Sequence, residues 1–384
     1  MLNVGVIGIG NCGNQIATLA KKECDCDVYA INTSENDLAT LPEGIPRLLV
    51  GDAQGTGKNR DAAKAFLKKS IMNIISDQGF SDFCASKEVL LVVSSMGGGS
   101  GSGMAPIMSD IIRSSFQNVD GSQKIVILVG VLPRISEGYT TQVNSLDYWH
   151  ELNDVIDKPT YMLYDNNNYK QETSFKILQT VNHEVIEDIK VIQCKYNKST
   201  PYDSIDEKDM KVLLDTPGRI VIASLLGIKE KDLDECTIED LLIDALKKNA
   251  HAELQRDGVV QRTGVITNLN EKLNAGFDTH IEKVRKFVGE PTEEFLHIAV
   301  NEDKALPNSC NLILTGLSPI VDRIDKIRDR IDEINAAQEA ANGEKNESDI
   351  SADEIAEMNA KRGYRKNNSG ANVDIKGIFD KFNA

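Results

Sequence analysis

The sequence predicts an α/β protein: a parallel-sheet nucleotide-binding domain, a long central helix, a second, smaller α+β domain, and a C-terminal helix followed by a flexible tail. Three observations predict it. Uniformly apolar runs alternate with amphipathic segments in the first half, as in a parallel sheet covered on both faces. One amphipathic stretch, Thr173–Val191, is long enough to separate two halves. Beyond it the spacing of apolar runs changes.

The first domain is expected over residues 1–170. Its strands are short buried runs, predicted at Val4–Ile9, Val28–Ile31, Val89–Val93, Ile125–Val131 and Tyr161–Tyr164. Its helices show apolar residues at helical spacing, and are predicted at Asn14–Lys22, Ala62–Ile75 and Pro106–Phe116. The central helix follows over residues 171–192.

The second domain is expected over residues 193–317. Its predicted strands are Arg219–Leu226, Val259–Thr267, Phe295–Val300 and Asn311–Leu317. Thr237 and Asp240 have the spacing of a capping box, which predicts a helix over Thr237–Lys248. A mixture of strands and few helices indicates a smaller α+β unit.

A C-terminal helix is expected over residues 318–342. Ser318 would cap it, Pro319 suits its first turn, and isoleucines form one stripe that must pack on another element. The stripe comprises Ile320, Ile324, Ile327, Ile331 and Ile334. Residues 343–384 are polar and are predicted to be a flexible tail. Two features interrupt this tail, a basic run at Lys361–Lys366 and an apolar cluster of Ile375, Ile378, Phe379 and Phe382.

Composition excludes several classes of protein. The 384 residues include 43 Lys and Arg against 59 Asp and Glu, a net charge of −16. An acidic surface does not wrap nucleic acid, which needs clustered cations. No run approaches the length of a membrane span, and Met1 leads into no secretory signal. Seven scattered cysteines suit reduced thiols, so a cytoplasmic location is expected and no protein metal site is.

A first glycine segment, Gly8–Gly13, has the form G-x-G-x-x-G between a predicted strand and a predicted helix. This arrangement points backbone N–H groups and a helix N-terminus at phosphate. Asp25 and Asp27 stand near the place of a ribose-binding acid, so a dinucleotide site and a purely structural turn are both open for this segment taken alone.

A second glycine segment, Gly97–Gly103, has five glycines in seven residues. Such density favours close backbone approach to a ligand rather than packing, because glycine lowers stability wherever its freedom must be frozen. Successive N–H groups would cradle a di- or triphosphate, with Ser100 and Ser102 as extra donors. The alternative, a flexible linker, conflicts with the buried elements on both sides.

A third segment, Gly51–Asn59, ends in Gly-Lys but is not a P-loop. Its first Gly lies six residues before Gly57 instead of five, and Asn59 stands where Ser or Thr would bind magnesium. A loop facing the terminal phosphate and a surface turn are equally compatible with it.

The two glycine segments together resemble the tubulin/FtsZ family. Gly97–Gly103 is similar to the signature GGGTGSG, with Ser for Thr, and Gly10–Ile16 is similar to GQCGNQI. Further matches follow in family order, at Asn32-Thr33, Pro133, Glu137-Gly138, Asp165-Asn166 and Asn182. The resemblance covers roughly residues 1–320. It implies a GTPase domain, a second domain that assists catalysis, and head-to-tail assembly into filaments.

The resemblance also implies roles for individual residues. GTP or GDP would be held by Asn32 and by two phosphate segments, namely Gly10, Asn11, Cys12, Gly97, Gly98, Gly99, Ser100, Gly101, Ser102 and Gly103. Glu137 would bind the ribose, and Asn166 and Asn182 would pair with guanine, for which an amide offers both a donor and an acceptor. Thr141 stands where FtsZ has an arginine, so a cationic phosphate contact is absent or comes from another residue.

Catalysis in this family is shared between two subunits. A segment after the central helix enters the neighbour's nucleotide site, and its carboxylates position water. Asp206 and Asp209 match that motif, while Ser204 departs from its Asn. If a helix begins at Glu207, both carboxylates lie on one side of its first turn. The alternative role for these acids is stabilisation of that helix N-terminus. Mg²⁺ would neutralise the triphosphate.

The long C-terminal helix and polar tail resemble the TubZ branch, whose members segregate plasmid or phage DNA. The resemblance implies that the tail engages a DNA-bound adaptor, TubR-like, and that Lys361–Lys366 assists electrostatically, with no direct sequence-specific DNA binding. The terminal apolar cluster instead resembles the FtsZ peptide that recruits membrane anchors, so an FtsZ-like division protein is the alternative. A dinucleotide-binding enzyme is a third, less favoured hypothesis.

Overall fold

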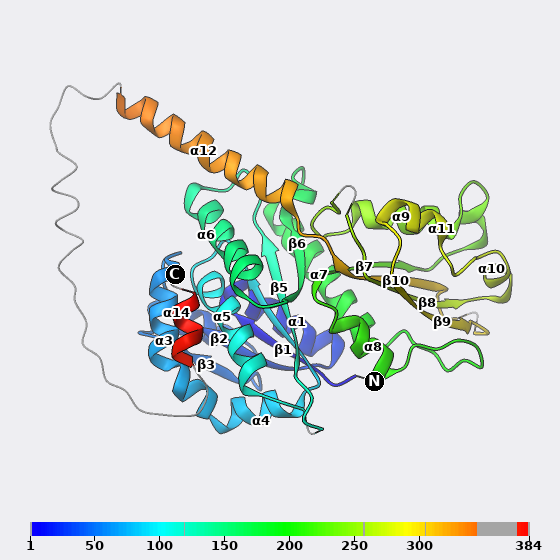
Figure 1. Ribbon diagram of the computed structural model, residues 1–384, viewed down its shortest axis with the longest axis horizontal. Helices are drawn as coiled ribbons and strands as arrows, with labels where there is room; N and C mark the ends of the chain where they lie inside the picture. The colour runs from blue at the N-terminus through cyan, green and yellow to red at the C-terminus, as the bar shows by residue number, and fades with distance from the viewer. Residues whose placement is uncertain (1, 119, 256–257, 304, 344–374, 383–384) are drawn as a thin grey trace.

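The chain forms two halves joined by one continuous sheet (Figure 1). The computed structural model describes residues 2–118, 120–255, 258–303, 305–343 and 375–382. The ten strands lie in the order β3-β2-β1-β4-β5-β6-β7-β10-β8-β9. The α/β class with a larger parallel half is confirmed.

The N-terminal half contains six parallel strands. They are β1 (Val4–Ile9), β2 (Asp27–Asn32), β3 (Arg47–Leu49), β4 (Val89–Ser95), β5 (Ile125–Leu132) and β6 (Thr160–Asp165). The helices are α1 (Gly10–Cys24), α2 (Glu35–Ala39), α3 (Arg60–Ser76), α4 (Gln78–Ser86), α5 (Ser100–Ser115) and α6 (Tyr139–His150). A π-helical turn, Glu151–Val155, extends α6, and a 3₁₀ turn, Asn166–Tyr169, follows β6. All five predicted strands of this half are present.

The sequence analysis missed α2, α4 and α6 because short or mixed-polarity helices give little periodic signal. It also began two helices too late. α1 starts at Gly10 and α5 at Ser100, so much of each predicted glycine loop is a first helical turn. Pro106 lies inside α5 rather than at its start.

The second half is a mixed sheet that extends the first. It contains β7 (Gly218–Leu226), β8 (Arg262–Leu269), β9 (Glu293–Val300) and β10 (Ser309–Leu317), with a 3₁₀ turn at Glu230–Leu233 and helices α9 (Ile238–Lys248), α10 (Glu271–Ala275) and α11 (Glu282–Val288). Strand β8 begins three residues later than predicted. β7 joins β6 through only two residue pairs, Thr160 with Gly218 and Tyr161 with Arg219. The two halves therefore share one sheet, but the pairing between β6 and β7 that joins them is short.

Helices cover both faces of the parallel strands because successive side chains point to opposite faces. Val4 and Val6 face one core with α1, the central helix α7 (Ser174–Ile192) and α8 (Glu207–Leu214). Ile7 and Ile9 face a second core with α3, α5 and α6. The predicted central helix is confirmed as α7, with Val181 and Val185 buried.

The C-terminal helix α12 (Val321–Gly343) packs against α6 and then projects from the molecule (Figure 1). Ile320, Ile324 and Ile327 are buried, so the predicted stripe is a packing face. Ser318 does not cap this helix. Its hydroxyl oxygen accepts a hydrogen bond from Val259 N at 2.8 Å instead, and the helix begins at Val321.

The prediction of a flexible tail is wrong for the last residues described. Residues Ile375–Lys381 form a helix, α14, that lies beside α3 and α5 (Figure 1). Phe379 and Phe382 are buried, because two aromatic rings at this spacing share one face of a helix. The rest of the tail, including Lys361–Lys366, lies outside the described residues.

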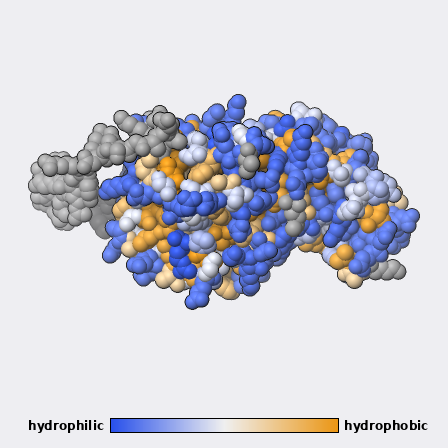
Figure 2. Space-filling model, turned by 90° about the horizontal axis from the view of Figure 1, so that it is seen from below, coloured by the Kyte–Doolittle hydropathy of each residue, from blue (hydrophilic) through white to orange (hydrophobic). Residues whose placement is uncertain are grey.

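Polar and charged side chains dominate the surface in Figure 2, with apolar patches mainly over the larger half. None of the helices within the described residues is long and apolar enough to cross a membrane.

Candidate functional site

The two glycine segments meet at the carboxyl ends of β1 and β4. Gly10 has a φ of +73°, and a Cβ placed on it would lie 2.9 Å from the backbone N of Gly101. Both segments are first turns of helices, whose N–H groups lack partners within the helix. Two helix N-termini in contact make a concentrated site for an anion.

Close packing within the chain explains most of these glycines, which corrects the argument that packing could not. A Cβ on Gly97 would lie 2.4 Å from Thr141 Cγ2, and one on Gly99 would lie 2.2 Å from Thr56 Oγ1. Gly98 differs. A Cβ there would meet a single atom of the described residues within 4 Å, Ser95 Oγ at 2.9 Å. Gly98 is therefore the glycine that a ligand can approach.

The hydroxyl groups divide into two kinds. Ser100 Oγ lies 2.5 Å from Thr33 Oγ1 and 3.4 Å from Thr56 Oγ1, at a partly buried meeting point of three loops. Ser102 is fully buried, and its hydroxyl donates to the carbonyl of Asn144. The expected donor role for the Ser102 side chain is thus wrong, because its proton is directed inward. Its position in the first turn still directs its backbone N–H along the helix axis.

The side chain of Asn32 also forms its hydrogen bonds within its own turn. Its side-chain oxygen accepts from the N–H groups of Thr33 and Ser34, and its amide nitrogen donates to Asp37. It shapes the turn that brings Thr33 to Ser100, rather than presenting a free amide.

The third loop carries a residue that sequence reasoning missed. Lys58 Nζ donates to Thr141 Oγ1 at 2.8 Å, and a Cβ on Gly99 would lie 2.8 Å from Lys58 Cα. Asn144 Nδ2 donates to the carbonyls of Lys58 and Gly98. The loop therefore lies against the two glycine segments, which we name the phosphate cradle after the ligand expected there. Lys58 brings a cation to Thr141, which the resemblance places where FtsZ has an arginine. Lys58 belongs to no ion pair among the described residues.

The loops after β5 and β6 are tied together beside this cradle. Glu137 Oε1 accepts from Arg134 N at 2.9 Å, and Asn167 Oδ1 accepts from Ile135 N at 3.3 Å. The side-chain oxygen of Asn166 is buried and has no hydrogen-bond partner in the part of the chain that the structure describes. An amide oxygen left in this state requires a partner that the protein does not supply.

A hollow of about 430 Å³ lies between α1 and α7. Asn182 lines it together with Gln15, whose amide donates to Asn11 Oδ1 at 3.2 Å. Phe175 lies on the same wall and is 70% exposed. The sequence analysis missed Phe175 and Gln15, although Phe175 and Asn182 are seven residues apart and so share a helix face. A flat aromatic ring beside an amide suits a planar base.

Cys12 packs against the core on the α1 side of the sheet. Burial raises the pKa of its thiol to about 12, so it contacts any ligand as a neutral group.

Asp206 and Asp209 begin α8 and form a capping box. Asp206 Oδ1 accepts from Lys208 N at 2.7 Å and from Asp209 N at 2.9 Å, while Asp209 Oδ2 accepts from Asp206 N at 3.1 Å. The two acids therefore do stabilise the N-terminus of α8, which is the alternative role expected for them. The other oxygen of each carboxylate accepts no hydrogen bond within the described residues, and Asp206 is exposed. Both acids can be reached from solvent.

The segment before α8 lies along the edge strand β9. Asp203 O accepts from Ile298 N at 2.9 Å, Ile205 N donates to His297 Nδ1 at 3.2 Å, and His297 Nε2 lies 2.9 Å from Lys198 O. Burial lowers the pKa of His297, which favours the neutral ring that these contacts require. His297 thereby fixes the acidic segment, and no sequence signal pointed to it.

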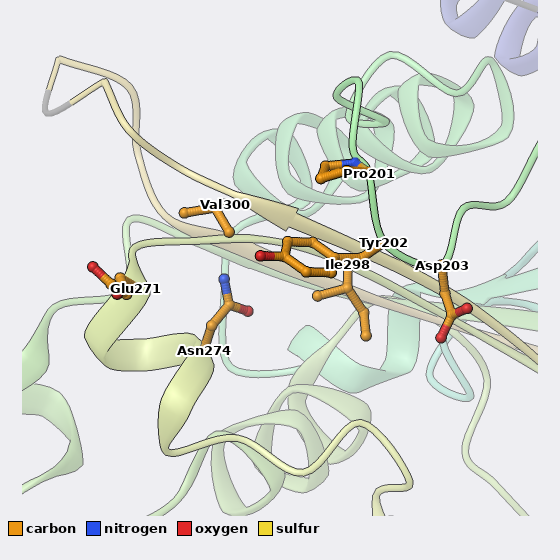
Figure 3. A pocket seen from close by; sticks show the side chains of 7 residues that line it. All are labelled: Pro201, Tyr202, Asp203, Glu271, Asn274, Ile298 and Val300. Carbon is orange, nitrogen blue, oxygen red and sulfur yellow. The ribbon is translucent and has the colours of Figure 1, made fainter.

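A hollow of about 520 Å³ lies beside this segment. Figure 3 shows Tyr202 projecting between Asn274 of α10 and Ile298 of β9. Tyr202 is 60% exposed. The surface beside the segment that precedes the two acids is thus open, indented and partly apolar.

The acids and the glycine segments lie at opposite ends of the central strands. Lys211 of α8 pairs with Glu88, directly before β4, whereas the Gly97–Gly103 segment follows β4. Strand β4 has seven residues, which at about 3.3 Å each separates the two sites by about 20 Å. In Figure 1, α8 lies beside the N-terminus, at the start of β1. One copy cannot bring the two sites together.

Residues 3–173 match the family model described as Tubulin/FtsZ family, GTPase domain. Together with the fold and the two glycine segments, this match makes residues 3–173 similar to the GTPase domain of the tubulin/FtsZ family. Two solved structures of similar fold hold guanine nucleotides: CetZ1 of Haloferax volcanii is described as a GDP-bound monomer and CetZ2 as a GTPγS-bound protofilament.

Among particular relatives, the chain is similar to the tubulin-like protein TubZ of Clostridium botulinum C phage. The two are 24% identical over 318 residues, which is 82% of this chain and 78% of the relative. A tail-truncated TubZ of C. botulinum phage c-st has the same fold, with a TM-score of 0.67 at 22% identity over 86% of this chain and 97% of that one. A GTPγS-form protofilament of Bacillus thuringiensis serovar israelensis TubZ gives 0.68 at 18% identity, over 89% and 94%.

Proposed function

We propose that this protein is a filament-forming GTPase in which GTP bound to one copy is hydrolysed with help from the next. The observation that carries the proposal is the separation of the phosphate cradle from exposed Asp206 and half-buried Asp209 by the length of β4. Two different surfaces that complete one site produce a head-to-tail polymer. A relative of the same fold is described as a protofilament, which supports this assembly.

In the proposed site, different loops bind the phosphates, the ribose and the guanine base. The first turns of α1 and α5 hold the phosphates, with Gly98 as the point of closest approach, and Lys58 supplies the cation. Glu137 accepts from the ribose, and Asn166 and Asn182 bind guanine, for which the unpartnered oxygen of Asn166 is a suitable acceptor. Mg²⁺ takes most of its ligands from the phosphates and water.

Asp206 and Asp209 of the incoming copy position the attacking water in this proposal. Their capping contacts are compatible with the role, because each acid uses one carboxylate oxygen and the other accepts no hydrogen bond within the described residues. Capping also fixes the two side chains, which lowers the entropic cost of placing a water between them.

We further propose that the filament acts in the cytoplasm and segregates plasmid or phage DNA. Its C-terminal tail would bind an adaptor protein that is itself bound to the DNA. Support comes from the similarity to TubZ over most of both chains and from the basic run in the tail. The proposed domain division is residues 1–170 for GTP binding, 171–192 for the central helix, 193–317 for the activation domain, 318–342 for the C-terminal helix and 343–384 for the tail. The end of this tail packs on the first domain as α14.

The test of the enzyme is GTP turnover per subunit as a function of protein concentration, alongside electron microscopy with GTP and with a slowly hydrolysed analogue. We expect turnover to rise steeply with concentration and filaments to form with either nucleotide. A rate that is independent of concentration, without polymers, would refute a site shared between copies.

The acids are tested with Asp206→Asn and Asp209→Asn. Asn is also a good N-cap at position 206, and at position 209 its side-chain oxygen can still accept from Asp206 N, so α8 stays intact. We expect unchanged GTP binding, turnover lower by at least about 100-fold, as for loss of a general acid–base group, and longer-lived filaments. Asp240→Asn is the matched control, since Asp240 belongs to the capping box of α9. Normal hydrolysis by either variant would remove that acid from the mechanism.

A further inference from the structure

The C-terminal helix α14 packs against α3 and α5, on a surface that we name the α3/α5 groove. Phe379 is 2% exposed and Phe382 is 6% exposed, and both belong to the apolar core beneath α3 and α5. They come from a Phe-x-x-Phe segment that is separated from α12 by residues 344–374. A short helix carrying two buried rings on a long tether is arranged as a docked ligand.

Charged groups of the groove match this segment. Lys381 Nζ lies 2.6 Å from Asp110 Oδ2, and Asp110 is 4% exposed. Lys68 Nζ lies 5.6 Å from the centroid of the Phe379 ring, within the range of a cation–π contact. Asp110 also lies 3.8 Å from Arg113. Undocking would leave this buried carboxylate with that longer pair alone, so Asp110 favours the docked state.

A chain of buried contacts joins this groove to the phosphate cradle. Lys64 Nζ donates to the carbonyl of Phe382 at 3.4 Å and pairs with Glu151 at 2.5 Å. Glu151 also pairs with Arg60 at 2.6 Å. Arg60 in turn donates to the carbonyl of Ser102 at 3.0 Å, in the first turn of α5. Arg60 and Glu151 are both 6% exposed, so this network is poorly screened by solvent.

We infer that the α3/α5 groove is a docking site for the Phe379–Phe382 segment and that nucleotide at the cradle weakens this docking through Arg60, Glu151 and Lys64. The inference rests on the proposed GTP site. A triphosphate on the first turn of α5 attracts Arg60 and leaves Glu151 paired mainly with Lys64. Lys64 then moves away from the Phe382 carbonyl. By linkage, a docked tail weakens nucleotide binding by the same factor.

This coupling makes the tail available when the GTPase is loaded. Docked, the two phenylalanines are covered and cannot contact another protein. Released, they present an aromatic pair at the end of a tether, as an anchor for a partner. The nucleotide state would thus decide when the tail can bind.

The docking is tested by hydrogen exchange of the full chain, at concentrations where light scattering detects no polymer. Amides 378–382 should be protected in nucleotide-free protein, and the double variant Phe379→Ala, Phe382→Ala should lose that protection. Asp380→Asn, at an exposed position of α14, is the matched control and should retain it. Absence of protection in the wild type would overturn the docking. Protection that grows with protein concentration would assign the segment to a second copy and overturn docking within one chain.

The groove itself is tested with a synthetic peptide of residues 375–384, labelled for fluorescence polarisation. A tethered segment has an effective concentration near the millimolar range, so wild-type protein should exclude the peptide while the double Phe variant binds it. Equal binding to both proteins would overturn the assignment of the groove.

The coupling is tested by adding GTPγS at measured saturation. Exchange at 378–382 should accelerate about fivefold or more, and Lys64→Met should abolish this response while GTPγS binding persists. Bound nucleotide with unchanged or slower exchange would overturn the coupling. Failure to bind GTPγS at all would refute the proposed function instead, so the two failures are distinguishable.

Discussion

Lowering the pH should release the acidic segment from β9 through His297. In the folded protein the neutral ring accepts from Ile205 N and lies in hydrogen-bonding distance of Lys198 O. Protonation converts Nδ1 from an acceptor into a donor, which leaves the Ile205 N–H without its partner. An unsatisfied buried N–H costs about 1–3 kcal/mol.

The sign of the effect follows from burial. Because burial lowers the pKa of His297 below its ordinary value of 6.5, the unfolded chain takes up this proton at a higher pH than the folded one. The stabilisation is therefore fully present above pH 6.5 and is lost as the pH falls through the lower folded pKa. The loss of about 1–3 kcal/mol corresponds to a 5- to 150-fold lower population of the ordered segment.

The assay is assembly-stimulated GTP turnover between pH 5.5 and 8, with nucleotide affinity measured at each pH. We expect turnover to fall on the acid side, while His297→Asn, whose Oδ1 can accept from Ile205 N without titrating, shows a flatter profile. His280→Asn is the control because His280 is exposed. Glu184 and Asp215, whose pKa values burial raises, are unchanged in all three proteins.

If turnover by His297→Asn falls at low pH as much as turnover by the wild type, the reasoning is refuted. It is also refuted if nucleotide affinity falls in parallel with turnover, because His297 lies with the acidic segment and not with the phosphate cradle.

Three further predictions concern the nucleotide half. Lys58→Met should weaken GTP binding about tenfold or more, as for loss of one charge-assisted contact, with an unchanged melting temperature; unaltered affinity would exclude Lys58 from the site. Gly98→Ala should fold normally and bind GTP poorly, whereas Gly99→Ala should be destabilised by about 1–3 kcal/mol in urea; the opposite order would contradict the assigned packing. Arg323→Met leaves buried Asp165 unpaired and should cost about 3–5 kcal/mol by urea unfolding, so a loss below 1 kcal/mol would refute the pair as a clamp of α12.

The sequence by itself determined most of the elements of the N-terminal half. Apolar runs and glycine segments marked β1, β4 and both glycine turns, because strand burial and helix N-termini leave local patterns. The isoleucine stripe of α12 was equally plain. Local patterns show which face of a helix or strand is apolar and which turns favour glycine.

Only the tertiary structure decided which elements meet. Lys58 reaches Thr141 across 83 positions of sequence, and Phe382 reaches Lys64 across 318. No periodicity encodes such pairs, since they depend on the order of strands in the sheet. The same holds for the distance that separates Asp206 from the glycine segments. It is set by the length of β4 and by the packing of α8 near the start of that strand.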